Sequence, residues 1–184
     1  WFVLAPPQQV ISRRASRDVQ DESCSDVLLE CLVRDVEMLV EMGTLDPPSC
    51  QRPADPIETP HDAELAAAHL RRVNDWGDGP LWGLQDLFAQ SGLYAFCRDL
   101  DGDSLDGSYL ALDSGGVALV NGLSPVGRRR FTLAHELGHH VFADQYSDEW
   151  ILGTSGDDRE KLINAFAVHL LLPRDDVRAR WQAL

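Results

Sequence analysis

The chain has 184 residues, of which 44% are hydrophobic and 25% charged, values typical of a folded globular protein. Its formal net charge of -14 argues against direct binding to nucleic acid, because affinity for a duplex comes largely from Lys and Arg on phosphates. The arginines that cluster at 13–17 and 128–130 predict solvated faces. No apolar run reaches the roughly 20 residues that span a bilayer, and no signal peptide is recognisable. We therefore expect a cytoplasmic protein with no membrane or nucleic-acid partner.

The pattern of apolar residues and prolines predicts three parts along the chain. Residues 1–45 form an N-terminal helical segment, because apolar residues recur at helical spacing from 23 to 42. Residues 46–60 contain five prolines, which favour extended backbone, and are predicted to be a linker. Residues 61–184 then form the main domain.

Within the main domain the pattern predicts helices, then a small sheet, then helices. The first two helices are expected at 62–74 and 81–90, and strands at 93–97, 108–112 and 116–121. Two further helices are expected at 124–143, with Ser124 as N-cap and Pro125 at the first helical position, and at 157–172, ending before Pro173. The fold class is therefore α+β, mainly helical, with a three-stranded antiparallel sheet.

Residues 135–139 read His-Glu-Leu-Gly-His, the spacing at which a helix holds a metal ion. Positions i and i+4 lie on one helix face, so His135 and His139 can both reach a single ion. Glu136 is the candidate general base, directed toward a water molecule on that ion. Zinc suits these ligands best, although manganese and iron also accept them. His140 points elsewhere and is expected to be structural or solvent-facing.

A catalytic zinc site usually has three protein ligands and one position for water. Glu160, on the next predicted helix, is the best candidate for the third ligand. Asn164 lies one turn later on the same face, where it can hydrogen-bond a ligating histidine. The alternatives that remain open are Asp157, Asp158 and His169.

This arrangement predicts hydrolysis of peptide bonds. Zinc lowers the pKa of water from about 15.7 to about 7, and Glu136 can then accept the proton and pass it to the leaving amine. The oxyanion that forms also needs a hydrogen-bond donor. Tyr146 and His169 are the candidates, and the sequence does not decide between them.

The sequence resembles the ImmA/IrrE family of metallo-endopeptidases over roughly residues 61–178. The segment 130–139, Arg-Phe-Thr-Leu-Ala-His-Glu-Leu-Gly-His, is similar to the signature helix of the family, and residues 160–167 followed by 170–173 are similar to its second signature. The resemblance implies a gluzincin-like site with His135, His139 and Glu160 as ligands and Glu136 as base. One departure is Leu162-Ile163, where the family often has Glu and Ala.

The resemblance also implies a substrate class and a biological setting. Members of this bacterial family typically cleave a helix-turn-helix repressor and so relieve repression of transcription, in stress responses or in mobile-element transfer. Many carry such a DNA-binding domain at the N-terminus, and residues 23–60 are similar to the segment that comes after this domain in the fused forms. The alternative is a regulatory module of a transcription regulator that binds zinc or a peptide without catalysis.

Overall fold

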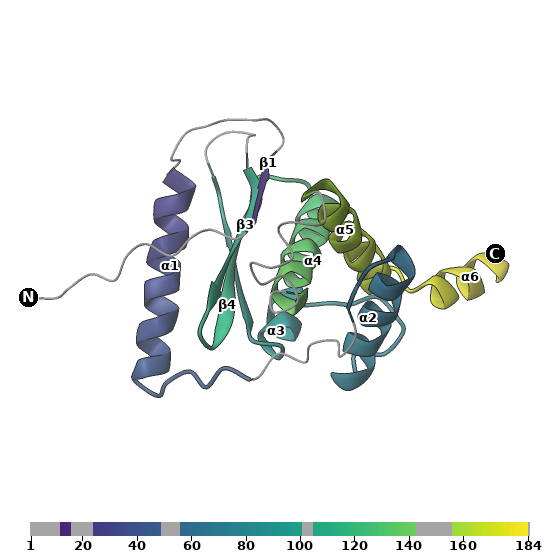
Figure 1. Cartoon of the computed structure of the whole chain (residues 1–184), viewed down its shortest axis with the longest axis horizontal. Helices are drawn as coiled ribbons and strands as arrows, with labels where there is room; N and C mark the ends of the chain where they lie inside the picture. The colour runs from purple at the N-terminus through teal and green to yellow at the C-terminus, as the bar shows by residue number, and fades with distance from the viewer. Residues whose placement is uncertain (1–11, 16–23, 49–55, 101–104, 143–155, 184) are drawn as a thin grey trace, which may run out of the picture.

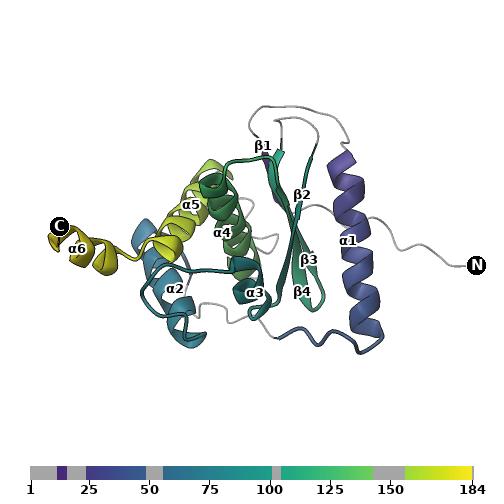
Figure 2. The ribbon, with the colours of Figure 1, turned by 180° about the vertical axis from the view of Figure 1, so that it is seen from behind.

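The computed structural model describes residues 12–15, 24–48, 56–100, 105–142 and 156–183. It has an α+β fold, as predicted, in which the elements form layers. Helix α1 (Cys24–Glu41) packs on one face of a central sheet and α4 (Val126–Phe142) on the other (Figures 1 and 2). Helix α5 (Gly156–Leu171) packs on α4, and α2 (Pro60–Val73) packs on α5. None of the helices among these residues is both long and apolar enough to cross a membrane.

The sheet is mixed, so the prediction of a purely antiparallel sheet was wrong. Its order is β1-β3-β4-β2, and β2 (Leu93–Arg98) runs parallel to β4 (Gly115–Asn121). Strand β3 (Leu105–Leu112) forms an antiparallel hairpin with β4, and the short β1 (Ser12–Ala15), which was not predicted, adds antiparallel to β3. Strand β4 is buried on both faces and takes the central place between β3 and β2. Strands β2 and β3 are consecutive in the chain but are not neighbours in the sheet, because β4 lies between them.

Alternate residues of β4 face opposite layers, as the pleat of a strand requires. Val117 and Leu119 belong to the apolar cluster with α1, and Ala118 and Val120 belong to the larger cluster with α4 and α5. Helix α1 therefore packs on β3 and β4, two strands that come far later in the chain. The division into segments 1–45, 46–60 and 61–184 stays a prediction.

Most element bounds lie close to those predicted, and the differences have local causes. Helix α2 begins at Pro60, because Thr59 caps it in a reciprocal pair of hydrogen bonds with Asp62. Helix α3 (Leu84–Ala89) begins after Gly83, and α4 begins one residue later than predicted. Helix α6 (Arg174–Gln182) was not predicted. Pro173, which marks the predicted end of the preceding helix, also serves as the N-cap of α6.

Arg71 joins α2 to α5 from a buried position. Its Nε donates to the carbonyl oxygen of Leu170 at 2.8 Å, and its NH1 donates to the carbonyls of Gly77 and Gly79. One guanidinium therefore satisfies acceptors at the C-terminal end of α5 and in the turn after α2. Because α5 also carries Glu160, this contact helps to position the candidate site.

Replacing Arg71 with Met should destabilise the protein by about 2–4 kcal/mol, because it removes three charge-assisted hydrogen bonds and takes the donor from the buried carbonyl of Leu170. Equilibrium unfolding in urea measures this loss. The matched control is Arg72→Met on the exposed face of the same helix, which should change stability by less than about 0.5 kcal/mol. Equal losses in the two variants would show that Arg71 has no special role.

Candidate metal centre

The two histidines of the motif lie one turn apart in the buried half of α4. The exposed fraction is 1% for His135 and 2% for His139, because the sheet covers one side of the helix and α5 another. Their Nε2 atoms approach each other to 3.1 Å. The helix thus directs two imidazole nitrogens at one point, as the spacing predicted.

Gly138 allows α5 to pack closely on α4 beside this pair. A Cβ atom at position 138 would lie 2.9 Å from Cγ2 of Ile163 and 3.2 Å from Cδ1 of Phe166. These side chains therefore rest directly on the α4 backbone. Glu160, one turn before Ile163 on α5, consequently lies beside the histidines.

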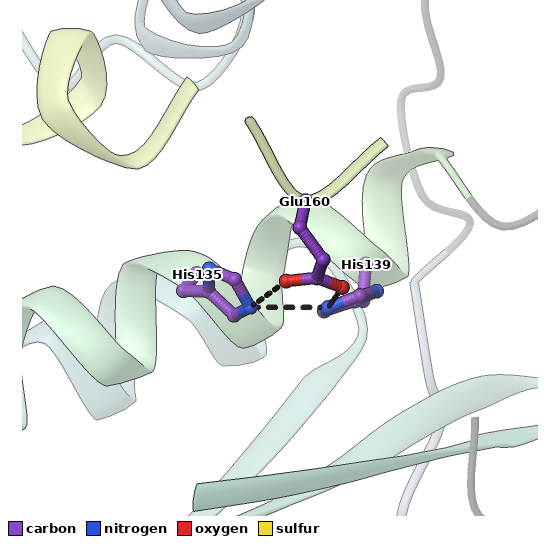
Figure 3. A group of neighbouring side chains, drawn as sticks. All are labelled: His135, His139 and Glu160. Carbon is purple, nitrogen blue, oxygen red and sulfur yellow. Dashed lines mark hydrogen bonds and ion pairs between the residues drawn. The ribbon is translucent and has the colours of Figure 1, made fainter. Parts of the chain in front are cut away.

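Glu160 brings its two carboxylate oxygens to the two imidazole nitrogens (Figure 3). Its Oε2 lies 3.3 Å from Nε2 of His135 and its Oε1 lies 3.5 Å from Nε2 of His139. Zinc–nitrogen bonds of about 2.0–2.1 Å in a tetrahedral site place the ligand atoms about 3.3 Å apart. The nitrogen–nitrogen distance of 3.1 Å and the two nitrogen–oxygen distances are therefore close to the spacing of ligand atoms in such a site. Among the residues that the structure describes, no other group of three or more His, Cys, Asp or Glu could hold a metal ion.

Two neighbours prepare these side chains for a cation. Oδ1 of Asn164 accepts a hydrogen bond from Nδ1 of His135 at 3.1 Å, which orients the ring with Nε2 toward the other ligand atoms. The hydrogen bond to His135 lowers the pKa of Glu160 below its ordinary value, and the nearby His139 adds to this, although burial acts in the opposite direction. The carboxylate form, which binds metals, is therefore favoured.

Glu136 lies between α4 and β3 and is fully buried. A Cβ atom on Gly107 would lie only 3.1 Å from its Oε1 and 2.4 Å from Cγ2 of Thr132, so only glycine fits in β3 at this point. An ion pair of 3.2 Å between Asp106 and Arg128 also ties β3 to the first turn of α4. The candidate base is thus held against the backbone of a strand.

The family model of the IrrE N-terminal-like domain, named for peptidase M78, matches residues 89–184. The chain belongs to this family. The match includes the whole of α4 and α5, and hence all three candidate ligands and Glu136. Family membership implies a metallopeptidase that uses a metal ion. No curated protein matches the chain.

The remaining candidates lie away from the three ligands or outside the described residues. Asp158 forms an ion pair with Lys161 at 2.9 Å, and His169 lies 3.9 Å from Glu64 in a hollow between α2, α5 and α6. Neither belongs to the group that could hold a metal ion. The side chain of Asp157, the third rival, is not among those that the structure describes, so its role stays a prediction. Tyr146 is not among the residues that the structure describes, so its role as an oxyanion donor stays a prediction.

His140 is structural, one of the two roles expected for it. Its Nε2 donates to the carbonyl oxygen of Ser91 at 2.9 Å, which leaves Nδ1 to accept from the hydroxyl of Tyr109 at 3.0 Å. The ring of Tyr109 in turn stacks on His139, with centroids 6.5 Å apart. This chain of contacts supports His139 from the side of the sheet.

Sequence reasoning did not identify Gly107, Gly138 or Tyr109 as parts of the site. A signal existed for Gly107, because glycine inside a strand often marks a close approach by another part of the molecule. Gly138 lies inside the motif, where the sequence shows only that a helix carries a small residue. Only the packing of α5 shows which neighbour it admits.

Replacing Gly138 with Ala should destabilise the protein by about 1–3 kcal/mol and weaken zinc binding, because the new methyl group pushes Ile163 and α5 away. Thermal unfolding and competition with a zinc chelator measure the two effects. Gly127→Ala is the matched control, since a Cβ atom there meets nothing within 4 Å. If both variants bind zinc like the parent, the close packing does not position Glu160.

Replacing Asn164 with Ala should lower zinc affinity by about 10–100-fold while the protein stays folded, because His135 loses the acceptor that orients its ring. The same competition experiment measures this change. Lys161→Ala, on the exposed face of α5, should leave zinc affinity unchanged. An unaltered affinity in the Asn164 variant would contradict the orienting role.

Proposed function

We propose that the protein is a zinc-dependent endopeptidase of the gluzincin type, with His135, His139 and Glu160 as ligands and Glu136 as general base. The observation that carries the proposal is the convergence of three side chains beside Glu136 of α4. The two imidazole Nε2 atoms lie 3.1 Å apart, and the two carboxylate oxygens of Glu160 lie 3.3 Å from that of His135 and 3.5 Å from that of His139. A zinc ion there supplies a Lewis acid that activates water and polarises a peptide carbonyl. Manganese and iron are the other metals that suit these ligands.

The side chains around the site divide the remaining work. Glu136 takes a proton from the attacking water and delivers it to the leaving amine nitrogen, which contributes about 10²–10⁴ in rate. Asn164 keeps the imidazole of His135 in its binding orientation. The Glu160 side chain is 48% exposed, in contrast to the buried histidines, so the site opens to solvent on this side.

A helix-turn-helix repressor is the proposed substrate, cleaved in the bacterial cytoplasm to relieve repression of stress-response or mobile-element genes. Two observations support it. The segments 130–139 and 160–173 resemble signatures of the ImmA/IrrE metallopeptidases. The formal net charge of -14 also suits a basic partner such as a DNA-binding domain, because opposite charges speed association.

Glu136→Gln tests the catalytic proposal. It should lower the cleavage rate by at least about 100-fold and keep the zinc content near one per chain, because the base is lost and the ligands remain. Cleavage of repressors encoded near this protein and elemental analysis measure the two quantities. Glu160→Gln is the companion variant and should lose both zinc and activity. Unchanged function in the Glu136 variant would favour the non-catalytic regulatory module.

A further inference from the structure

Strand β1 lies on the edge of the sheet beside the candidate base. Its register places Arg14 opposite Gly107, and Gly107 is the residue whose missing side chain makes room for Glu136. Neighbouring strands lie about 4.8 Å apart, so a segment of the chain's own N-terminal part runs one strand spacing from Gly107. Strand β1 also contacts α4, the helix that carries the base and two ligands.

The outer edge of β3 is a site at which an extended peptide can bind through its backbone. Edge strands present N–H and C=O groups that pair with an added strand, and many proteins bind peptides in this way. At the other edge of the sheet, Gln85 of α3 already donates to the carbonyl oxygen of Ala95 in β2 at 2.9 Å. The edge of β3 is the one next to Glu136.

The pairing of β1 is limited in extent, and the rest of the sheet does not depend on it. Strand β1 has four residues, and its register shifts between Arg14 and Ala15. Strands β3, β4 and β2 remain paired without it, and helices cover both faces of this three-stranded sheet. The fold therefore survives when β1 leaves the edge.

We propose that β1 occupies the place on β3 at which the backbone of a peptide substrate binds, so that hydrolysis requires β1 to leave. This inference rests on the proposed endopeptidase function and adds its regulation. Glu136, the base that must act on the substrate, is fully buried in this arrangement. The chain holds itself inactive until another peptide, or another conformation of the N-terminal part, displaces β1.

The double variant Arg13→Pro/Arg14→Pro in the full chain removes β1 from the edge. Successive residues of a strand direct their N–H groups to opposite sides. One of the two prolines therefore removes an N–H group that faces β3, whichever of the two residues that is. The matched control is Arg13→Gln/Arg14→Gln, which loses the same two charges and keeps both N–H groups. Circular dichroism and thermal unfolding establish that both variants are folded.

Binding to the free edge is measured first, without any need for activity. Both double variants carry Glu136→Gln, and the probe is a fluorescein-labelled peptide of residues 9–18. The proline variant should bind the peptide at least about tenfold more tightly than the glutamine variant. The reason is that β1 leaves the edge of β3 free in a larger fraction of its molecules. A scrambled peptide of the same composition controls for attraction between a basic peptide and an acidic protein.

Cleavage of a fluorogenic peptide library by the two double variants with Glu136 intact is measured second. The proline variant should show a kcat/KM at least about tenfold higher than that of the glutamine variant, at equal zinc content. Equal rates and equal peptide binding in two folded variants overturn the inference and leave the proposed function standing. Tight peptide binding by the proline variant with no cleavage by any zinc-loaded chain overturns the proposed function instead. A proline variant that fails to fold shows β1 to be an integral strand and also overturns the inference.

Discussion

The close packing of α5 on α4 at Gly138 is the contact on which the candidate metal centre depends. The two histidines owe their positions to a single helix, but the third ligand comes from a different helix, and its position depends on how near that helix lies. With no side chain at 138, Ile163 and Phe166 rest on the α4 backbone, and Glu160 reaches the imidazoles at 3.3 and 3.5 Å. The departure at Leu162-Ile163 from the usual residues of the family fits this contact, because both side chains are buried in the main core.

The sheet supports the same centre from the opposite side of α4. Tyr109 of β3 stacks on His139 and hydrogen-bonds to His140, while Gly107 gives Glu136 its space. Burial of these polar groups is costly unless they keep hydrogen-bond partners. Helix α1 stabilises the sheet that supplies such partners, because it covers the other face of that sheet. The N-terminal helix is therefore part of the structure that supports the site.

Exposure divides the site into a fixed part and an accessible part. The histidines and Glu136 are buried, whereas the carboxylate of Glu160 lies at the boundary with solvent. Rigid ligands beside one open side suit a reaction in which the substrate must enter while the geometry stays constant. Strand β1 pairs with β3 opposite Gly107, at the border of the buried part, so its position can affect access to Glu136.

The sequence alone determined the features that repeat along one element. The i, i+4 spacing placed His135 and His139 on one face with Glu136 between them, and the same reasoning linked Glu160 to Asn164. Among the residues that the structure describes, it also predicted the α+β class, three of the four strands and five helices close to their observed bounds. Only the tertiary structure decided that β2 runs parallel to β4, that β1 joins β3, and that Gly107 and Gly138 are the points of closest approach. The spacing within a helix follows from its own hydrogen bonds, whereas the neighbours of a strand depend on which distant segments bury each other's apolar faces.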